Sequence, residues 1–431
     1  MDLKALGGMR DYIGPGAEDV NNLIKTARRV FATAGFRAID TPILEDARLF
    51  DRSLGSGSDV VSKEMYTVQQ GEDRLIALRP ENTAGVVRCL VENQLMQNRN
   101  QLKCIYAGKM FRHERPQSGR LRQFHQVGGE VLGRDDPLVD AELLHLSARF
   151  LEETGIDSYR LLLNSLGCEE CRPGYLEKLR QTIEPHREEI CDNCRRRLKE
   201  NPLRILDCKN ETDQRLYKEE LAGILEFICG DCSDHFDKVK NYLEQFEVEY
   251  EISPRLVRGL DYYTRTTFEF VSGELGSQDA VLAGGRYDRL VEQLGGEPTP
   301  AIGFSAGVER MMLLRGTYND NRVDLDIDCF FVPLGEECLE DILPLISEYR
   351  SRRHPVETRD ISLECGNPDD SIRSQLRRAN RYNARVVLIY GDREKEAGKI
   401  SIKNMISGEQ NEFDFPPDDV VVKILAATYE N

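Results

Sequence analysis

One stretch, residues 111–133, limits the fold strongly because it encodes a β-hairpin whose inner face is polar. It reads FRHERPQSGRLRQFHQVGGEVLG. We predict a first strand that carries Arg112 and Glu114, a loop over 116–122, and a return strand. Alternate residues of the return strand share one face, namely Phe124, Gln126, Gly128 and Glu130. Polar groups on a strand that is otherwise apolar indicate a ligand site, and an amphipathic surface hairpin is the alternative.

The length, net charge and cysteine content favour a multidomain globular protein in a reducing compartment. A chain of 431 residues predicts two or three domains. Its net charge of −17 argues against a general nucleic-acid coat protein, but it leaves room for a local basic face. Twelve cysteines without a recognisable signal peptide predict a cytoplasmic protein whose cysteines are free thiols or metal ligands. No apolar run is long enough for a membrane span, so no membrane association is expected.

The first part of the chain alternates between helical and strand periodicity. Apolar residues with helical spacing predict amphipathic helices over 20–31, 83–95 and 138–154. Short apolar runs predict strands over 36–39, 75–78, 102–106 and 159–164. Glu81 lies at the junction between a strand and the helix that begins at Thr83. It is either a helix-start charge or a ligand contact, and both interpretations stay open.

Residues 166–235 are rich in charge and cysteine. CxxC occurs three times, as Cys168/Cys171, Cys191/Cys194 and Cys229/Cys232, with Cys208 between the last two pairs. Two thiolates on one turn converge on one ion, so paired CxxC motifs suit tetrahedral zinc. The first two pairs, about twenty residues apart, form the preferred four-ligand set. Free cysteines in a small helical insertion are the alternative.

Three further segments combine strands with glycine. An alternating strand follows RGLDYY (258–263), in which Arg258, Asp261 and the tyrosines surround a glycine. AVLAGGRYDRLV (280–291) predicts a strand, a turn at Gly284-Gly285 and a helix. AIGFSAGVERMMLLRG (301–316) predicts a strand and a helix with Arg310 in its first turns. A cation there opposes the helix dipole, so we expect an anionic partner from the protein or from a nucleotide phosphate.

The last hundred residues change to a βαβαβ pattern after a polar stretch, 319–326, that is a predicted linker. Strands are expected at 327–332 and 384–390, with helices near 336–349 and 368–382. The second helix carries a basic cluster, Arg373, Arg377, Arg378 and Arg381. This cluster is either a solvated face or a contact for a phosphate backbone.

Together these motifs resemble the histidyl-tRNA synthetase family of class II aminoacyl-tRNA synthetases, over almost the whole chain. Residues 36–42 resemble motif 1 at the dimer interface, the hairpin resembles motif 2, and GFSAGVER (303–310) resembles motif 3. RGLDYY and GGRYDRL (284–290) are similar to two signatures of the histidine enzymes, and RPENTAG (79–85) to their amino-acid-binding loop. Two segments depart from the family pattern, namely the cysteine-rich insertion and LECGNPDDSIRS (363–374).

The resemblance implies an α+β fold with three parts. An antiparallel catalytic sheet flanked by helices spans 1–322, a helical insertion occupies about 166–235, and a C-terminal α/β anticodon-binding domain spans 326–431. It also implies ATP, Mg²⁺, L-histidine and tRNA(His) as substrates or cofactors, and a homodimer. Structural zinc is not inherited from the family, so its presence stays open.

For ATP, the resemblance implies that Arg112 and Arg258 are the catalytic residues, placed against the α-phosphate, where charge develops. Glu114 and Arg120 are expected at the adenine and on the γ-phosphate side. Arg310 is expected at the γ-phosphate, and Phe124 is expected to stack on the adenine.

For histidine, Glu130 and Tyr263 are expected to contact the two ring nitrogens, with Tyr262 in the same pocket. Glu81 and Thr83 are expected to bind the α-amino group, and Gln126 the carboxylate side.

Two rival functions share the fold. One is an inactive paralogue that regulates histidine biosynthesis by partnering a phosphoribosyltransferase. Such proteins typically lack the C-terminal domain and the ATP-binding arginines, whereas this sequence has Arg112, Arg310 and the C-terminal pattern. The other is an RNA-sensing binding module, which normally lies in a much larger chain with a kinase.

Overall fold

The structure is a computed structural model that describes residues 3–55, 58–71, 74–260, 262–276, 280–319, 326–356, 360–417 and 419–429. The chain divides into two compact units, Met1–Asn321 and Arg322–Asn431, which are described separately. Asp261 of RGLDYY and residues 320–325 of the predicted linker lie outside the described residues.

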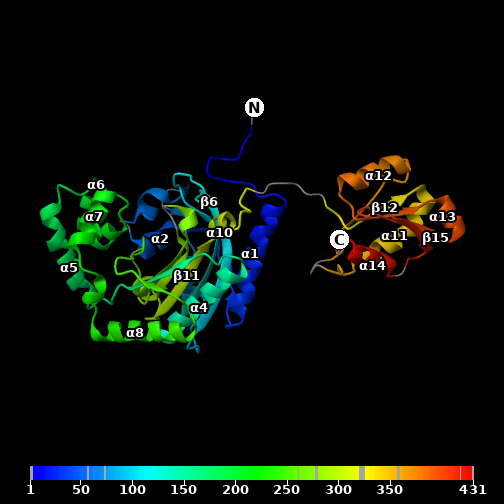
Figure 1. The fold of residues 1–431 in the computed structure, drawn as a ribbon. Coiled ribbons are helices and arrows are strands. Elements are labelled where there is room, and N and C mark those ends of the chain that lie inside the picture. The colour runs from blue at the N-terminus through cyan, green and yellow to red at the C-terminus, as the bar shows by residue number, and fades with distance from the viewer. Residues whose placement is uncertain are drawn as a thin grey trace. The chain divides into compact units, whose positions relative to one another are not determined.

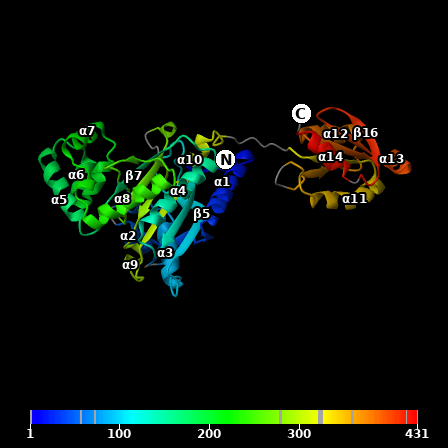
Figure 2. The same ribbon diagram turned by 60° about the horizontal axis from the view of Figure 1, so that its bottom comes forward.

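An eight-stranded sheet forms the centre of the first unit (Figures 1 and 2). Its spatial order is β1 (Arg37–Ala38), β5 (Leu102–Phe111), β6 (Gln123–Leu132), β11 (Ala301–Gly307), β10 (Ala280–Arg286), β9 (Thr264–Val271), β7 (Arg160–Ser165) and β8 (Glu251–Ile252). The six strands from β5 to β7 pair antiparallel. The edge strands β1 and β8 pair parallel with their neighbours. The predicted antiparallel sheet is therefore confirmed for its six central strands.

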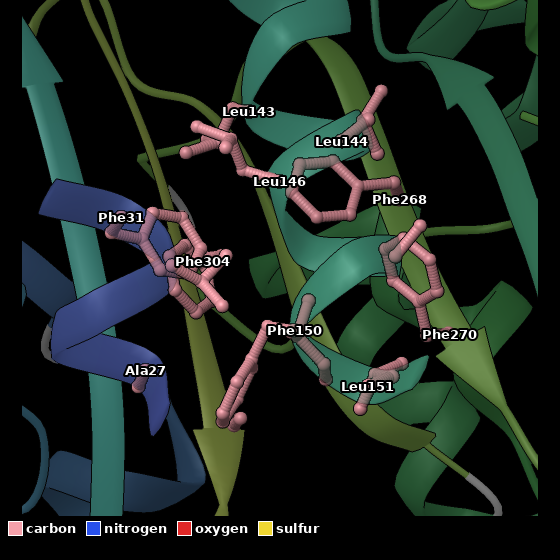
Figure 3. Packing of buried hydrophobic residues seen from close by; sticks show 14 of the residues in the cluster. Ala27, Phe31, Leu143, Leu144, Leu146, Phe150, Leu151, Phe268, Phe270 and Phe304 are labelled. Atoms are coloured by element: carbon pink, nitrogen blue, oxygen red, sulfur yellow. The ribbon is translucent and has the colours of Figure 1, made fainter. Parts of the chain in front are cut away.

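Three helices pack their apolar stripes on one face of this sheet, namely α1 (Pro15–Ala32), α4 (Pro137–Glu153) and α8 (Gly230–Gln245). Phe31 of α1 stacks on Phe304 of β11 with ring centroids 4.7 Å apart, and Phe150 of α4 lies edge-on to Phe31 (Figure 3). Val127 and Val131 of β6 enter the same core. Because side chains alternate along a strand, Gln126 and Glu130 must face the opposite side of the sheet.

A smaller sheet lies beside the junction that carries Glu81. Its strands are β2 (Leu44–Asp46), β4 (Arg74–Leu78) and β3 (Thr67–Gln70), and the neighbouring helices are α2 (Ala47–Leu54) and α3 (Thr83–Glu92). The Glu81 carboxylate accepts the backbone N–H groups of Thr83 at 2.7 Å and Ala84 at 3.0 Å. These donors lack partners within the helix, so Glu81 stabilises the start of α3.

The insertion between β7 and α8 is helical, as predicted. It contains α5 (Arg172–Ile183), α6 (Asp192–Glu200), a 3₁₀ segment (Pro202–Asp207) and α7 (Glu211–Glu220), seen in green in Figures 1 and 2. Its fully buried side chains include Leu179, Ile183 and Ile205. These residues share one buried apolar cluster with Phe50 and Val87, so the insertion packs against the rest of the first unit.

Two local predictions were wrong. β5 ends at Phe111, so Arg112 and Glu114 follow the first strand of the hairpin instead of lying in it. Gly284 and Gly285 lie inside β10, and they form no turn. A Cβ at Gly284 would lie 2.1 Å from the carbonyl oxygen of Gly303, so the glycines permit close strand contact. The predicted helix that follows is a single short one, α9 (Leu290–Gln293).

The second unit is a five-stranded α/β domain. Its sheet order is β13 (Leu363–Cys365), β12 (Cys329–Pro333), β14 (Val386–Tyr390), β15 (Lys399–Asn404) and β16 (Gln410–Asp414). The first three strands pair parallel and the last two antiparallel. Its helices are α11 (Glu336–Arg350), α12 (Ile372–Arg381), α13 (Asp392–Ala397) and α14 (Val420–Ala427). α12 begins later than predicted because the Ser371 hydroxyl caps it, accepting the N–H of Ser374 at 3.3 Å.

Within the described ranges, we find no helix with the length and apolar character that a membrane crossing requires.

Candidate active site

A cavity of about 460 Å³ lies on the Gln126/Glu130 face of the large sheet. All the candidate site residues line it, although they come from distant parts of the chain. They are Glu81, Thr83, Arg112, Glu114, Arg120, Phe124, Gln126, Glu130, Arg258, Tyr262, Tyr263 and Arg310. The structure thus gathers every one of these residues around one space.

The four predicted arginines reach the cavity from three segments of the chain. Arg112 follows β5, Arg120 lies in the hairpin loop, Arg258 precedes β9, and Arg310 lies in α10 (Val308–Leu314). Arg112 is oriented by its Nε, which donates to the backbone carbonyl of Pro80 over 2.8 Å. Cationic groups that converge from separate elements are typical of a site for an anion.

An acidic and an aromatic side chain lie among these cations. Glu114 forms an ion pair with Arg120, and its Oε1 lies 3.8 Å from Nη1 of Arg112. The ring centre of Phe124 lies 5.5 Å from the guanidinium carbon of Arg112. Phe124 therefore presents an aromatic surface beside positive charge, which suits a flat, polar ring such as a nucleobase.

The electrostatics of Arg310 show how concentrated the positive charge is. Burial and repulsion from Arg120 and Arg112 lower the pKa of Arg310 to about 10. Burial also lowers the pKa of Arg112 and the pKa of Arg120. Arg310 donates from Nη1 to the backbone carbonyl of Ala280. A multiply charged anion would relieve this repulsion, and the anionic partner expected for Arg310 stays a prediction.

Arg258 is held differently, by a carboxylate of the sheet. It forms an ion pair with Glu269 of β9. Burial lowers the pKa of Arg258, but Glu269, with smaller contributions from Tyr263, Asp207 and Tyr262, offsets this effect, so the pKa is raised overall. The Tyr263 ring centre lies 5.8 Å from its guanidinium carbon. Arg258 therefore lies between the arginine group and the tyrosines.

Glu130 is the most deeply buried acid of the cavity, with no exposed surface. Its Oε1 accepts from the Thr83 hydroxyl at 2.7 Å, and its Oε2 accepts from the Tyr287 hydroxyl at 2.5 Å. Burial raises the pKa of Glu130 to about 8, although both hydrogen bonds lower it. Tyr287 was not among the predicted site residues, but it lies within GGRYDRL, so that motif was the available signal.

Three tyrosines surround this carboxyl group. The rings of Tyr262 and Tyr263 lie 4.6 Å apart, and Tyr287 lies edge-on to Tyr262 at 5.6 Å. Burial is the largest cause that raises the pKa of each hydroxyl. The hydroxyls therefore stay protonated and can act as hydrogen-bond donors.

Glu81 and Gln126 complete the polar lining near Glu130. Burial raises the pKa of Glu81, and this effect exceeds the lowering by the two backbone N–H groups that donate to the carboxylate. The buried Oε1 of Gln126 has no hydrogen-bond partner among the described residues. Buried polar atoms are rarely left unpaired, so an unfilled acceptor in a cavity wall suggests a group that a ligand satisfies.

A buried charged network behind the sheet was not predicted from the sequence. Arg286 contacts Asp140 of α4 at 2.7 Å and Asp288 at 3.0 Å, and Arg286 and Asp140 have no exposed side-chain surface. His235 of α8 also contacts Asp140, at 2.9 Å. Burial raises the pKa of Asp140, but Arg286 and His235 together outweigh this effect and the pKa is lowered overall. The network fixes the end of β10 from which Tyr287 reaches Glu130.

The insertion also contributes side chains to the cavity that were not predicted. Arg197, Arg204 and Lys209 line it, together with Asp59, which lies outside the insertion. Asp59 lies 3.3 Å from Arg197 and 3.3 Å from Arg204. The high charge density of the insertion was the only sequence signal for this contribution.

The cysteine pairing predicted from spacing was wrong. Cys168 and Cys171 gather with Cys229 and Cys232, and not with the second pair. The second pair, Cys191 and Cys194, gathers with Cys208 and Asp213. The chain returns to the end of β7 when α8 begins, and this return joins the first and third pairs.

The basic cluster of the second unit lies on an open helix surface. The arginines at 373, 377, 378 and 381 of α12 are all exposed. Gln375 and Ala379, on the other side of the helix, are buried. The cluster therefore forms one solvent-facing cationic stripe.

Comparison with known proteins settles the family. The profile described as "Histidyl-tRNA synthetase" matches residues 8–311, and the profile described as "Anticodon binding domain" matches residues 328–426. The chain belongs to the histidyl-tRNA synthetase family. The family's catalytic part thus contains the whole cavity, and the second unit corresponds to the anticodon-binding fold.

Individual relatives of this family match along nearly their full length. The histidine–tRNA ligase of Solibacter usitatus is 41% identical, over 99% of this chain and all of the relative. That of Trichlorobacter lovleyi is 43% identical, over 95% of each chain. The crystal structure of apo S. aureus histidyl-tRNA synthetase superposes with a TM-score of 0.78 at 30% identity, covering 98% of this chain and all of that one.

Proposed function

We propose that this protein is a histidine–tRNA ligase. It activates L-histidine with ATP, giving histidyl-adenylate and pyrophosphate, and then transfers histidine to the 3′ end of tRNA(His). The observation that carries the proposal is a single cavity in which arginines from distant parts of the chain meet a buried, hydrogen-bonded Glu130. The arginines suit a triphosphate, and the carboxyl group suits a small ring with hydrogen-bonding nitrogens.

In the first step, a carboxylate oxygen of histidine attacks the α-phosphorus of ATP and pyrophosphate leaves. Negative charge builds on the α-phosphoryl oxygens, and preorganised cations lower the barrier. We assign this role to Arg112 and Arg258, because arginine stays charged and donates to two oxygens at once. Pro80 and Glu269 orient the two guanidinium groups before substrate binds.

The remaining cationic side of the cavity is assigned to the rest of ATP. Phe124 would stack on the adenine. Glu114 and Arg120 would together hold the adenine and the γ-phosphate side of ATP. Arg310 would contact the γ-phosphate, which would relieve the repulsion that lowers its pKa. Mg²⁺ neutralises phosphate charge when it is bound. The cavity carboxylates Glu114 and Glu269 carry the oxygen ligands that it prefers, so they would hold it beside the phosphates.

Histidine is assigned to the tyrosine side of the cavity. Each carboxylate oxygen has two lone pairs, so Glu130 can accept an imidazole N–H while it keeps Thr83 and Tyr287. Tyr263 would contact the other ring nitrogen, and Tyr262 lies against it. A site that depends on such hydrogen bonds rejects analogues lacking the partner by about 10⁴-fold or more.

The backbone groups of the amino acid are assigned to three residues beside this pocket. Glu81 and Thr83 would bind the α-amino group, and Gln126 would face the carboxylate side. The unfilled acceptor of Gln126 supports a polar ligand at this position. These assignments place the reacting carboxylate between the histidine pocket and the arginines.

The second unit is assigned to tRNA. The exposed arginine stripe of α12 offers cations to the RNA backbone, which local charge can attract even in a protein of net charge −17. We also infer a cytoplasmic homodimer. The three-stranded sheet exposes 52% of Leu44 and 54% of Val68, which a second copy would cover.

The test is histidine-dependent exchange of pyrophosphate into ATP, followed by charging of tRNA(His). A ligase catalyses both reactions. An inactive regulatory paralogue or an RNA-binding module catalyses neither, so absence of exchange in a folded, full-length preparation would refute the proposal. Omitting histidine, or replacing it with another amino acid, is the control for specificity.

A further inference from the structure

Four cysteines converge where the insertion leaves and rejoins the catalytic unit. Cys168 and Cys171 follow β7, whereas Cys229 and Cys232 lie at the start of α8. The Sγ of Cys168 lies 3.6 Å from that of Cys171 and 3.8 Å from that of Cys229. The Sγ atoms of Cys171 and Cys232 are 4.0 Å apart.

These separations match a tetrahedron of thiolates around zinc. With Zn–S bonds of about 2.3 Å, the edges of such a tetrahedron are about 3.8 Å long. Disulfide sulfurs lie only about 2.05 Å apart, so these distances do not describe disulfides. The four sulfurs lie within 4.8 Å of one another, close enough to share one ion.

A second cluster lies inside the insertion. Cys191 and Cys194 at the start of α6 meet Cys208 and Asp213, again within 4.8 Å of one another. The Sγ atoms of Cys191 and Cys208 are 3.8 Å apart, and Oδ2 of Asp213 lies 3.3 Å from Sγ of Cys208. Thiolate and carboxylate ligands at typical zinc distances would lie about 3.6 Å apart.

We propose that the insertion binds two structural zinc ions. The neck site consists of Cys168, Cys171, Cys229 and Cys232, and the inner site of Cys191, Cys194, Cys208 and Asp213. Each set supplies four protein ligands and leaves no position for substrate, as in structural rather than catalytic zinc sites. Together they use seven of the twelve cysteines.

The neck site is connected to the cavity through Arg172, the residue after Cys171. Arg172 donates from Nη2 to the backbone carbonyl of Tyr263 over 2.6 Å, and from Nε to the carbonyl of Leu166 over 3.1 Å. Zinc bound at the neck site would therefore fix the start of α5 and, through Arg172, the backbone that carries Tyr263. Arg172 is a positioning residue in this arrangement.

The inner site is also connected to the cavity. Cys208 lies between Asp207 and Lys209, and both neighbours line the cavity. Arg197 of α6, three residues after Cys194, contacts Asp59 of the catalytic unit at 3.3 Å. Zinc would hold these cavity-lining residues of the insertion in one rigid arrangement.

Metal analysis of the full-length protein, purified without chelators, tests the proposal. We expect two zinc ions per chain, and one each for Cys168→Ser and Cys208→Ser. Cys89→Ser is the matched control, because this half-buried cysteine belongs to neither cluster, and it should retain both ions. Fewer than two zinc ions in the parent protein, even after purification with added Zn²⁺, would overturn the two-site proposal. Iron in place of zinc would also overturn it.

A measurement on the unaltered chain keeps the test decisive if the serine variants do not fold. A thiol-reactive mercurial should release zinc as the seven cluster cysteines are modified, as followed with a chromogenic chelator. X-ray absorption should show sulfur ligands at about 2.3 Å. Rapid modification of all twelve cysteines without zinc release, or native disulfides within the clusters by mass spectrometry, would contradict the proposal.

Discussion

The Tyr287 hydroxyl reaches Oε2 of Glu130 over 2.5 Å by passing across the strand that lies between them. That strand is β11, where Gly303 pairs with Glu130 on one side and with Gly285 on the other. A Cβ at Gly303 would lie 1.6 Å from Oε2 of Glu130. The missing side chain therefore makes the space in which the two residues meet.

Gly303→Ala should displace the Glu130 carboxyl group, because the new methyl group occupies its position. We expect the KM for histidine to rise at least tenfold in pyrophosphate exchange, with a much smaller change for ATP. Gly273→Ala is the control, since nothing lies within 4 Å of a Cβ there. Equal KM values for the Gly303 variant and the parent would show that the carboxyl position is not needed for histidine.

Glu130→Gln should also raise the KM for histidine far more than the KM for ATP. The amide keeps the shape of the carboxyl group but can present a donor where an imidazole N–H requires an acceptor. Steady-state pyrophosphate exchange measures both constants. Equal effects on the two substrates would mean that Glu130 has a structural role alone.

The raised pKa of Glu130 predicts a pH-dependent stability. The native carboxyl group has a pKa of about 8 against an ordinary value of 4.5, so the native state holds a proton that the unfolded state has lost between these values. This stabilising contribution is complete below about pH 4.5 and is lost as pH rises through 8.

Thermal unfolding of ligand-free protein measures this effect. From pH 5.5 to 8.5 the parent should lose stability relative to Glu130→Gln, by at most about 1.4 kcal/mol per pH unit. A stability difference that stays constant over this range would show that Glu130 is ionised throughout.

Arg258→Ala should reduce pyrophosphate exchange by about 10²–10³-fold, as loss of one preorganised charge at a developing anion typically does. Arg160→Ala is the control, because Arg160 is 60% exposed and pairs with Glu251 on the surface. Circular dichroism and thermal unfolding establish that both variants are folded. Exchange within a few-fold of the parent would rule out the proposed contact with the α-phosphate.

Replacing Arg377 and Arg378 with alanine should weaken tRNA binding and leave pyrophosphate exchange unchanged. Each lost phosphate contact should reduce the slope of log K against log salt by about 0.7–0.9. Arg393→Ala is the matched control, since Arg393 is 82% exposed but lies outside the stripe. Unchanged affinity and salt slope would remove α12 from the tRNA-binding surface.

The antiparallel sheet, the helical insertion and the C-terminal α/β domain could all be predicted from the sequence. The periodicity of apolar residues locates single helices and strands, and the resemblance to the synthetase family predicts how they are arranged. The positions of Arg112 and Glu114 could not be derived in this way, because β5 ends at Phe111 and a contact distant in the chain, from the Arg112 side chain to the carbonyl of Pro80, orients Arg112. Likewise, a Gly-Gly pair signals either a turn or a close strand contact, and only the neighbouring strands distinguish the two.

Contacts between distant segments account for the remaining differences. Spacing suggested joining Cys168 with Cys191, but the fold brings Cys229 to Cys168 because α8 starts where β7 ends. The pairing of Arg286 with Asp140 joins residues that lie far apart in the chain. No local pattern encodes either contact, since both depend on how the helices pack on the sheet.

The close approach of Cys168 and Cys229 means that the polypeptide departs from the sheet and comes back at nearly the same point. Everything between them is a detour that leaves the spacing of β7 and β9 untouched, since Leu166 and Gly167 bond directly to Arg265. The strands can therefore keep their pairing when such a segment changes in length, whereas the cavity residues that it supplies, Arg197, Arg204 and Lys209, change with it.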